Sequence, residues 1–179
     1  MRDWLSEADA VDVAVYAAVA GTETPRLDSA MRRLSGAADH SKLWVGAAVA
    51  MAVLGGESGR RSAKRGLVSL ALASTFANLV AKPLTTRRRP DREALKVLER
   101  RHVSMPRTSS FPSGHTASAF AFATGAGQAQ PSLSAPLRAL ATLVGYSRVH
   151  TGVHYPADVL VGAFIGVSAA ELAGRLLDR

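Results

Sequence analysis

Five uncharged, Ala-rich stretches constrain the fold of this chain more than any other feature of its sequence. Stretches of this kind form helices that are buried either in a protein core or in a lipid bilayer. Several are shorter than the roughly 20 residues that span a bilayer, so they cross it only if their polar ends lie at its surface. The alternative is a soluble, Ala-rich helical bundle. The stretches are residues 43–56, 66–81, 116–137, 139–147 and 159–170.

The first part of the chain is more polar than the rest. Residues 5–20 mix acidic side chains with Val and Ala, which predicts a short amphipathic helix lying on the membrane or against the bundle. A further short helical piece is expected at residues 26–34. We therefore expect one domain of 179 residues, an all-α integral membrane bundle with about five transmembrane helices plus the amphipathic helix. Residues 1–40 form its peripheral segment and residues 41–179 the bundle that carries the site.

Charge and cysteine content limit the chemistry. The formal net charge of +8 favours an anionic partner, which could be nucleic acid, acidic lipid headgroups or a phosphorylated substrate. Because the chain has no cysteine, disulfides, thiolate zinc sites and a cysteine nucleophile are excluded.

Two basic segments flank the second apolar stretch. The first contains Arg60, Arg61, Lys64 and Arg65, and it is expected to form a tight loop on the cytoplasmic side by the positive-inside tendency. The second is the loop of residues 82–111, which has ten Lys, Arg or His residues. The two segments lie at opposite ends of one helix, so only one of them can face the cytoplasm. We therefore assign the charge of the second loop to a functional site on the extracytoplasmic side.

A helix start at residues 113–115 has the features of an anion site. Ser113 follows a proline and precedes an uncharged run, so it is expected to cap a helix whose first amides are unpaired. These amides and the helix dipole favour a phosphate beside Gly114. His115, one step into the first turn, can point at the same oxygens. A plain capped helix is the alternative for this tripeptide alone.

A second motif surrounds His154. A turn at Gly152 would bring His154 near Arg148, and Asp158 lies four residues further along. A carboxylate that binds one imidazole nitrogen fixes the tautomer and leaves the other nitrogen free to attack. His154 is therefore the predicted nucleophile, with Asp158 to orient it. His150 has no carboxylate at this spacing, and we interpret it as a surface or interface histidine.

The remaining cations suit phosphoryl transfer. Lys82, Arg89 and Arg148 would neutralise the phosphoryl oxygens as the transferring group departs. Arg87 and Arg88 are instead expected to lie at the membrane surface.

These segments resemble the signature of the type 2 phosphatidic acid phosphatase superfamily, Lys-x6-Arg-Pro, Pro-Ser-Gly-His and Ser-Arg-x5-His-x3-Asp. The resemblance covers residues 82–158, with every motif position present. It implies a phosphatase without a metal or other cofactor. Lys82, Arg89, Ser113, Gly114 and Arg148 would bind the phosphate. His154 would attack phosphorus, His115 would protonate the leaving oxygen, and Asp158 would orient His154.

The implied substrate is a membrane lipid phosphate, hydrolysed at the extracytoplasmic surface of the cell membrane. Ala and Arg richness resembles proteins of GC-rich bacteria, where small members of the superfamily include a phosphatase acting on decaprenylphosphoryl-5-phosphoribose. Other polyprenyl phosphates or diphosphates, phosphatidic acid and phosphatidylglycerol phosphate stay open. Two other functions also stay open. One is a vanadate-dependent haloperoxidase, which shares the phosphate-binding set, and the other is a basic nucleic-acid binder. Nucleic acid is not the expected partner, because the few aromatic residues do not alternate with the basic ones. The sequence does not indicate the oligomeric state.

Overall fold

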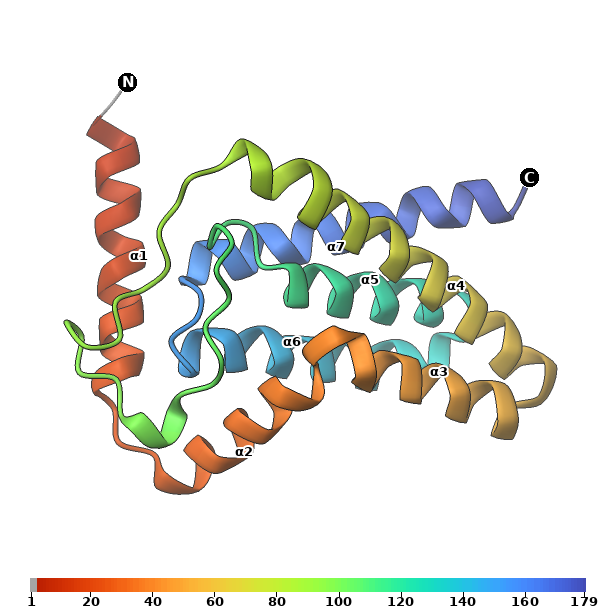
Figure 1. Cartoon of the computed structure of the whole chain (residues 1–179). Helices are drawn as coiled ribbons and strands as arrows, with labels where there is room; N and C mark the ends of the chain where they lie inside the picture. The colour runs from red at the N-terminus through yellow and green to blue at the C-terminus, as the bar shows by residue number, and fades with distance from the viewer. Residues whose placement is uncertain (1–2) are drawn as a thin grey trace.

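The computed structural model describes residues 3–179, with side chains from residue 6, and in this range every regular element is a helix (Figure 1). The all-α prediction is confirmed. Short helical segments are η1 (Asp39–Ser41), η2 (Phe76–Ala81), η3 (Lys82–Leu84), η4 (Glu99–Arg101) and η5 (Pro131–Leu133). The long helices are α1 (Asp3–Gly21), α2 (Pro25–Ala37), α3 (Lys42–Leu54), α4 (Gly56–Thr75), α5 (Gly114–Ala129), α6 (Ser134–His150) and α7 (Pro156–Leu177).

Helix α5 lies at the centre of the bundle and packs against α4, α6 and α7 (Figure 1). Ala, Gly, Ser and Thr make up most of this helix, and 12 of its 16 residues are buried. Because small side chains let helix backbones approach closely, three neighbours fit around it. A larger pair, Trp44 and Phe122, fills the space towards α3 with ring centroids 5.3 Å apart. The start of α5 is thereby held firmly at one end of the bundle.

Helix α4 begins earlier than the sequence predicted, so the expected basic loop is wrong. Gly56 has a φ of 59° and reverses the chain between α3 and α4 within a single residue. No longer loop is needed, and the basic cluster lies on the first turns of α4 itself. One member, Arg65, pairs with Asp178 at 2.9 Å. The cluster consists of Arg60, Arg61, Lys64 and Arg65.

The other end of this helix delivers Lys82 to the site, as predicted. Helix α4 continues through η2, a π-helical segment, into η3. The wider turns of η2 lie one turn before Lys82. The continuous helix Gly56–Leu84 spans the whole bundle, so the basic cluster and Lys82 lie at opposite ends (Figure 1).

The polar N-terminal part folds as two helices at the end of the bundle where the loop of residues 85–113 lies (Figure 1). Helix α1 extends the predicted helix at residues 5–20, and α2 extends the piece expected at residues 26–34. Tyr16 of α1 is buried and makes an edge contact with Tyr155, with ring centroids 5.5 Å apart. Helix α1 therefore packs on the bundle.

Two of the described helices are long and apolar enough to cross a membrane, Gly56–Leu84 and Pro156–Leu177. Their outer surfaces carry large apolar side chains, including Leu79, Leu160 and Phe164, each at least 70% exposed. Exposed apolar surface of this extent is typical of contact with lipid.

Candidate functional site

The start of α5 forms a cradle with the helix cap that the sequence predicts. The Ser113 side chain accepts hydrogen bonds from the Thr116 amide at 3.4 Å and the Thr116 hydroxyl at 2.9 Å, which confirms Ser113 as the N-cap. At the next residue, a Cβ atom added to Gly114 would lie 3.4 Å from the Lys82 ammonium. The absence of a side chain there lets the backbone of the first turn approach the Lys82 cation.

A polar cavity of about 210 Å³ opens in front of this cradle. Five of the predicted site residues line it, namely Lys82, Arg89, Gly114, His115 and His154. Three others lie behind its wall. Ser113 is fully buried as a cap, Asp158 is fully buried behind His154, and Arg148 is 2% exposed. The predicted residues therefore contribute two cations and two imidazoles to the cavity, from segments far apart in the sequence.

His154 is held by the turn that precedes α7. Gly152 has a φ of 70°, and the amides of Val153 and His154 both donate to the Arg148 carbonyl, at 3.1 and 3.2 Å. The predicted turn is thus present. His154 Nδ1 lies 3.4 Å from Asp158 Oδ2, and Nε2 lies 3.3 Å from an Arg89 nitrogen.

This geometry defines the tautomer of His154. A guanidinium has donors but no acceptor, so the Nε2 atom facing Arg89 must accept, and the proton resides on Nδ1 beside Asp158. Burial lowers the pKa of His154 to about 3, although its hydrogen bond with Asp158 acts in the opposite direction. The ring is therefore neutral near pH 7, with an electron pair directed into the cavity.

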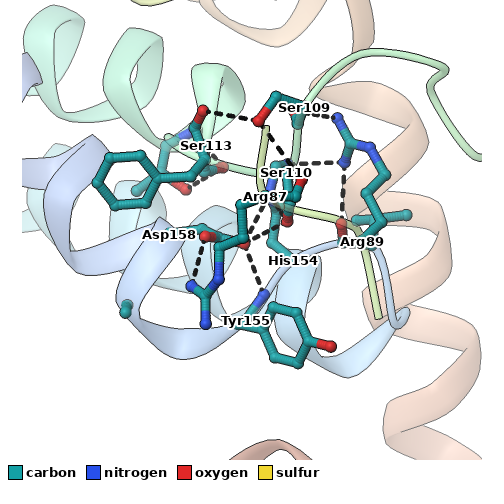
Figure 2. Close-up of polar contacts among 12 residues, drawn as sticks. Arg87, Arg89, Ser109, Ser110, Ser113, His154, Tyr155 and Asp158 are labelled. Carbon is teal, nitrogen blue, oxygen red and sulfur yellow. Dashed lines mark hydrogen bonds and ion pairs between the residues drawn. The ribbon is translucent and has the colours of Figure 1, made fainter. Parts of the chain in front are cut away.

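Asp158 receives more donors than His154 alone (Figure 2). Its Oδ2 accepts from the Ser110 hydroxyl and, at 2.9 Å, from the Tyr155 amide. Its Oδ1 accepts from Arg87 at 2.8 Å. A buried carboxylate with several donors keeps its charge and its orientation. The imidazole that it contacts is therefore firmly positioned.

Arg87 is the guanidinium in this network, so the predicted surface position is wrong for this residue. Besides Asp158 it pairs with Asp9 and Asp12 of α1, each at 2.7 Å, and it lies 4.5 Å from the centroid of the Tyr155 ring. Burial disfavours its charge, yet the hydrogen bond with Asp12 and the charge of Asp158 raise the pKa of Arg87 above its ordinary value. Three carboxylates draw the side chain inward. Arg88 is exposed, as predicted.

Arg89 is anchored by main-chain oxygens. It donates to the carbonyls of Thr108, Val153 and Ser109 at 3.0, 2.9 and 3.1 Å. These bonds tie the loop of residues 85–113 to the turn that carries His154. They also hold the guanidinium at the wall of the cavity.

The second histidine of the cavity has a carboxylate partner that the sequence analysis missed. His115 Nε2 lies 2.8 Å from Oδ1 of Asp39, in η1. The same oxygen is 3.7 Å from Arg148, whose guanidinium also donates to the Ser35 hydroxyl. Arg148 Nε is buried and has no hydrogen-bond partner among the described residues. Asp39 thus connects the His115 and Arg148 side chains.

His150 belongs to a separate buried network, so of the two predicted positions, surface or interface, the surface one is wrong. The ring is 2% exposed and lies 2.9 Å from Asp28 of α2. Asp28 also accepts from Arg100 and Arg101, both at 2.6 Å. Burial opposes ionisation of Asp28, but the hydrogen bonds from Arg100 and His150 outweigh it and hold its pKa well below the usual range. This network joins α2, η4 and α6 away from the cavity.

The sequence analysis missed two further residues of the site. Ser110 reaches Asp158 across 48 residues. Asn78 lines the cavity and accepts from Lys82 at 2.8 Å, four residues along the helix. The helical spacing of Asn78 and Lys82 could have indicated this pair. The contact of Ser110 depends on the path of the loop.

Comparisons with known proteins agree with this arrangement. The family model of the PAP2 superfamily matches residues 64–178. Over 158 residues the chain is 36% identical to the decaprenylphosphoryl-5-phosphoribose phosphatase of Mycolicibacterium smegmatis, covering 86% of this chain and 80% of that protein. Identity to the protein of the same name from Mycobacterium tuberculosis is 34%, covering 91% of this chain and 86% of that protein.

Solved structures show the same fold. The crystal structure of Aquifex aeolicus LpxE superposes with a TM-score of 0.72 at 25% identity, covering 91% of this chain and 94% of that chain. The first transmembrane PAP2 type phosphatidylglycerolphosphate phosphatase from Bacillus subtilis also gives a TM-score of 0.72, at 22% identity, covering 96% of this chain and 87% of that chain.

Proposed function

The chain belongs to the PAP2 superfamily and is a phosphoric ester hydrolase, and from this premise we propose that it is a metal-independent phosphatase of a polyprenyl-linked membrane lipid. The observation that carries the proposal is the cavity in which a neutral His154, with Nε2 directed inward, faces Lys82, Arg89 and His115. A nucleophile, an acid and two cations are the groups that phosphoryl transfer through a covalent intermediate requires.

In the proposed reaction the phosphate binds between the α5 start and the cations. The amide of Gly114 and the side chains of Lys82 and Arg89 contact its oxygens, and Ser113 shapes the cradle as the helix cap. Arg148 supplies a further guanidinium, because a phosphate oxygen would give its buried Nε the acceptor that it lacks. Positive charge is thus arranged around the transferring group before reaction.

His154 Nε2 then attacks phosphorus, and the bond to the leaving oxygen breaks. His115 gives its proton to that oxygen, and Asp158 stabilises the positive charge on the His154 ring through Nδ1. In the second half, neutral His115 takes a proton from water, which displaces His154 and releases inorganic phosphate. The nucleophile must be neutral at the start, and the lowered pKa of His154 supports this role.

The substrate proposal rests on the named relatives. Two proteins at 34–36% identity are called decaprenylphosphoryl-5-phosphoribose phosphatase, and the chain covers at least 80% of each. We therefore propose a polyprenyl-linked phosphomonoester, with decaprenylphosphoryl-5-phosphoribose as the first candidate. Glycerolipids such as phosphatidic acid or phosphatidylglycerol phosphate are the alternative that the same site chemistry would accept.

We further propose about five membrane crossings, by α3, α4 and α5 to α7, with the site facing the extracytoplasmic side. The basic cluster at the start of α4 lies at the end of the bundle opposite the cavity (Figure 1). By the positive-inside tendency that end faces the cytoplasm. Single cysteines introduced at Arg61 and Arg88 would report their sides through labelling by a membrane-impermeant thiol reagent in intact cells. Labelling at residue 61 and none at residue 88 would reverse the orientation.

Phosphate release tests the function. The detergent-purified protein is given a polyprenyl-phosphoribose phosphate, polyprenyl phosphate, phosphatidic acid and phosphatidylglycerol phosphate, with and without EDTA. We expect release from the polyprenyl-phosphoribose phosphate, unchanged by EDTA and absent in His154→Ala. Release from a glycerolipid alone would mean that the substrate is a glycerolipid and not a polyprenyl-linked lipid. Equal release by His154→Ala would reject the mechanism.

A further inference from the structure

Asp39 contacts His115 of the cavity from a part of the chain outside the matched region 64–178. It lies in η1, between α2 and α3, with Oδ1 2.8 Å from His115 Nε2 and 3.7 Å from Arg148. The other two residues of η1, His40 and Ser41, line the cavity wall. This segment therefore belongs to the site although no signature motif contains it.

The backbone around Asp39 is held in an unfavourable conformation. His40 and Ser41 have φ values of 54° and 59°, and a non-glycine residue in this region costs on the order of 1 kcal/mol or more. On one side, Ala38 is 3% exposed and packs in the same core cluster as Trp44 of α3. The fold maintains two strained residues in sequence, and their effect is to present the Asp39 carboxylate to His115.

The charges around His115 come from several elements. Burial lowers the pKa of His115, and the charges of Arg148 from α6 and Lys82 from the end of α4 act in the same direction. The hydrogen bond with Asp39 from η1 opposes this shift and favours a proton on the ring. The hydrogen bond from His115 lowers the pKa of Asp39, outweighing burial, so the carboxylate is ionised. Arg89 and His154 face the same cavity. Among these groups, Asp39 is the anion in contact with His115.

We propose that Asp39 is a positioning residue that holds His115 as the acid for departure of the leaving group. The site then has two histidine–carboxylate pairs, His154 with Asp158 for attack and His115 with Asp39 for departure. The inference rests on the proposed function. As the P–O bond breaks, its electron pair stays on the leaving oxygen, which takes the Nε2 proton that His115 shares with Asp39. His115 becomes neutral and Asp39 remains a carboxylate.

Leaving groups of different acidity test this role. Phenyl phosphate and p-nitrophenyl phosphate have similar shapes, but only the phenyl ester needs much help from an acid. For Asp39→Asn we expect kcat/KM for phenyl phosphate to fall about tenfold or more, and that for p-nitrophenyl phosphate to change by less than about threefold. The basic limb of the pH profile for phenyl phosphate should move to lower pH, because the anion that favours protonated His115 is gone.

A double-variant comparison shows whether Asp39 acts through His115. In a His115→Ala background, Asp39→Asn should have no further effect on kcat/KM for phenyl phosphate. Asp178→Asn, which removes a partly exposed carboxylate at the far end of the bundle, is the matched control and should leave both rates unchanged.

Three outcomes would overturn the inference. An equal loss for both esters would mean that Asp39 is only structural. A gain in rate with tighter inhibition by inorganic phosphate would mean that Asp39 merely competes with the substrate anion. In either case the proposed function would stand, provided that the wild-type protein releases phosphate and His154→Ala does not. Failure of the wild-type protein to hydrolyse either ester or any lipid of the panel would reject function and inference together.

Discussion

The protein contains two buried histidine–aspartate pairs, His154 with Asp158 and His150 with Asp28, and they differ in what the second ring nitrogen contacts. His154 Nε2 faces Arg89 at the wall of the cavity, whereas His150 Nδ1 lies 3.3 Å from the Tyr146 hydroxyl. Both rings are at most 2% exposed. Burial and a carboxylate therefore do not identify a nucleophile. What supports His154 as the proposed nucleophile is that its free nitrogen faces Arg89 at the wall of the cavity.

The two carboxylates also differ in their basic partners. Asp28 accepts from Arg101, whose side chain is fully buried, while Asp158 accepts from Arg87, which is partly exposed and has Asp9 and Asp12 as further partners. Loss of Asp28 would thus leave a buried charge poorly compensated. Loss of Asp158 would leave Arg87 with two carboxylates. One pair is expected to matter for stability, the other for the rate.

The largest expected effect separates the two histidines. His154→Ala should reduce phosphate release by at least about a thousandfold, because no other group can take the place of the nucleophile. His150→Ala should keep the rate per folded molecule within about tenfold of wild type. Both rates are measured on detergent-purified protein from a single size-exclusion peak. Comparable losses in the two variants would erase the distinction between the pairs.

The next effect separates the two aspartates. Asp28→Asn should lower the free energy of unfolding by about 3 kcal/mol or more, because Arg101 keeps a buried charge without its carboxylate. Asp158→Asn should destabilise less and retain a weak activity above that of His154→Ala, since the nucleophile remains but its orientation is lost. Thermal unfolding in detergent and phosphate release are measured for both. A lower melting temperature in Asp158→Asn than in Asp28→Asn would contradict this assignment.

The smallest effect concerns Ser110, which donates to Asp158. Ser110→Ala removes one hydrogen bond of about 1 kcal/mol and should slow turnover roughly three- to tenfold without changing the substrate preference. Ser62 is the matched control, because its hydroxyl is buried without a hydrogen-bond partner among the described residues. Ser62→Ala should behave as wild type. An equal loss in the two variants would show a packing effect and not an orienting one.

The helices and the signature residues could be predicted from the sequence because both depend on local pattern. Uncharged stretches of helical length predicted α3 to α7. The position of Ser113 between a proline and an uncharged run predicted a helix cap, and the spacing of His154 to Asp158 predicted their contact. The start of α4 was predicted too late, because the positive φ of Gly56 lets the helix begin there and include the basic cluster that was assigned to the loop.

The partners from distant segments could not be predicted. Arg87 meets Asp158 across 71 residues, and Asp28 meets His150 across 122. Such pairs depend on how helices pack, and spacing in one sequence carries no information about them. For the same reason Arg87 was assigned to the membrane surface, and His150 was assigned to a surface or interface without its partner Asp28.

Asp12, Asp28 and Asp39 lie in α1, α2 and η1, all before the matched region 64–178. Each neutralises part of a strongly cationic catalytic half, through Arg87, through Arg100 and Arg101, and beside Arg148. The first third of the chain thus supplies carboxylates that compensate part of the positive charge of the rest. A substitution at any one of these three carboxylates therefore changes the charge close to the signature residues while every signature residue stays in place.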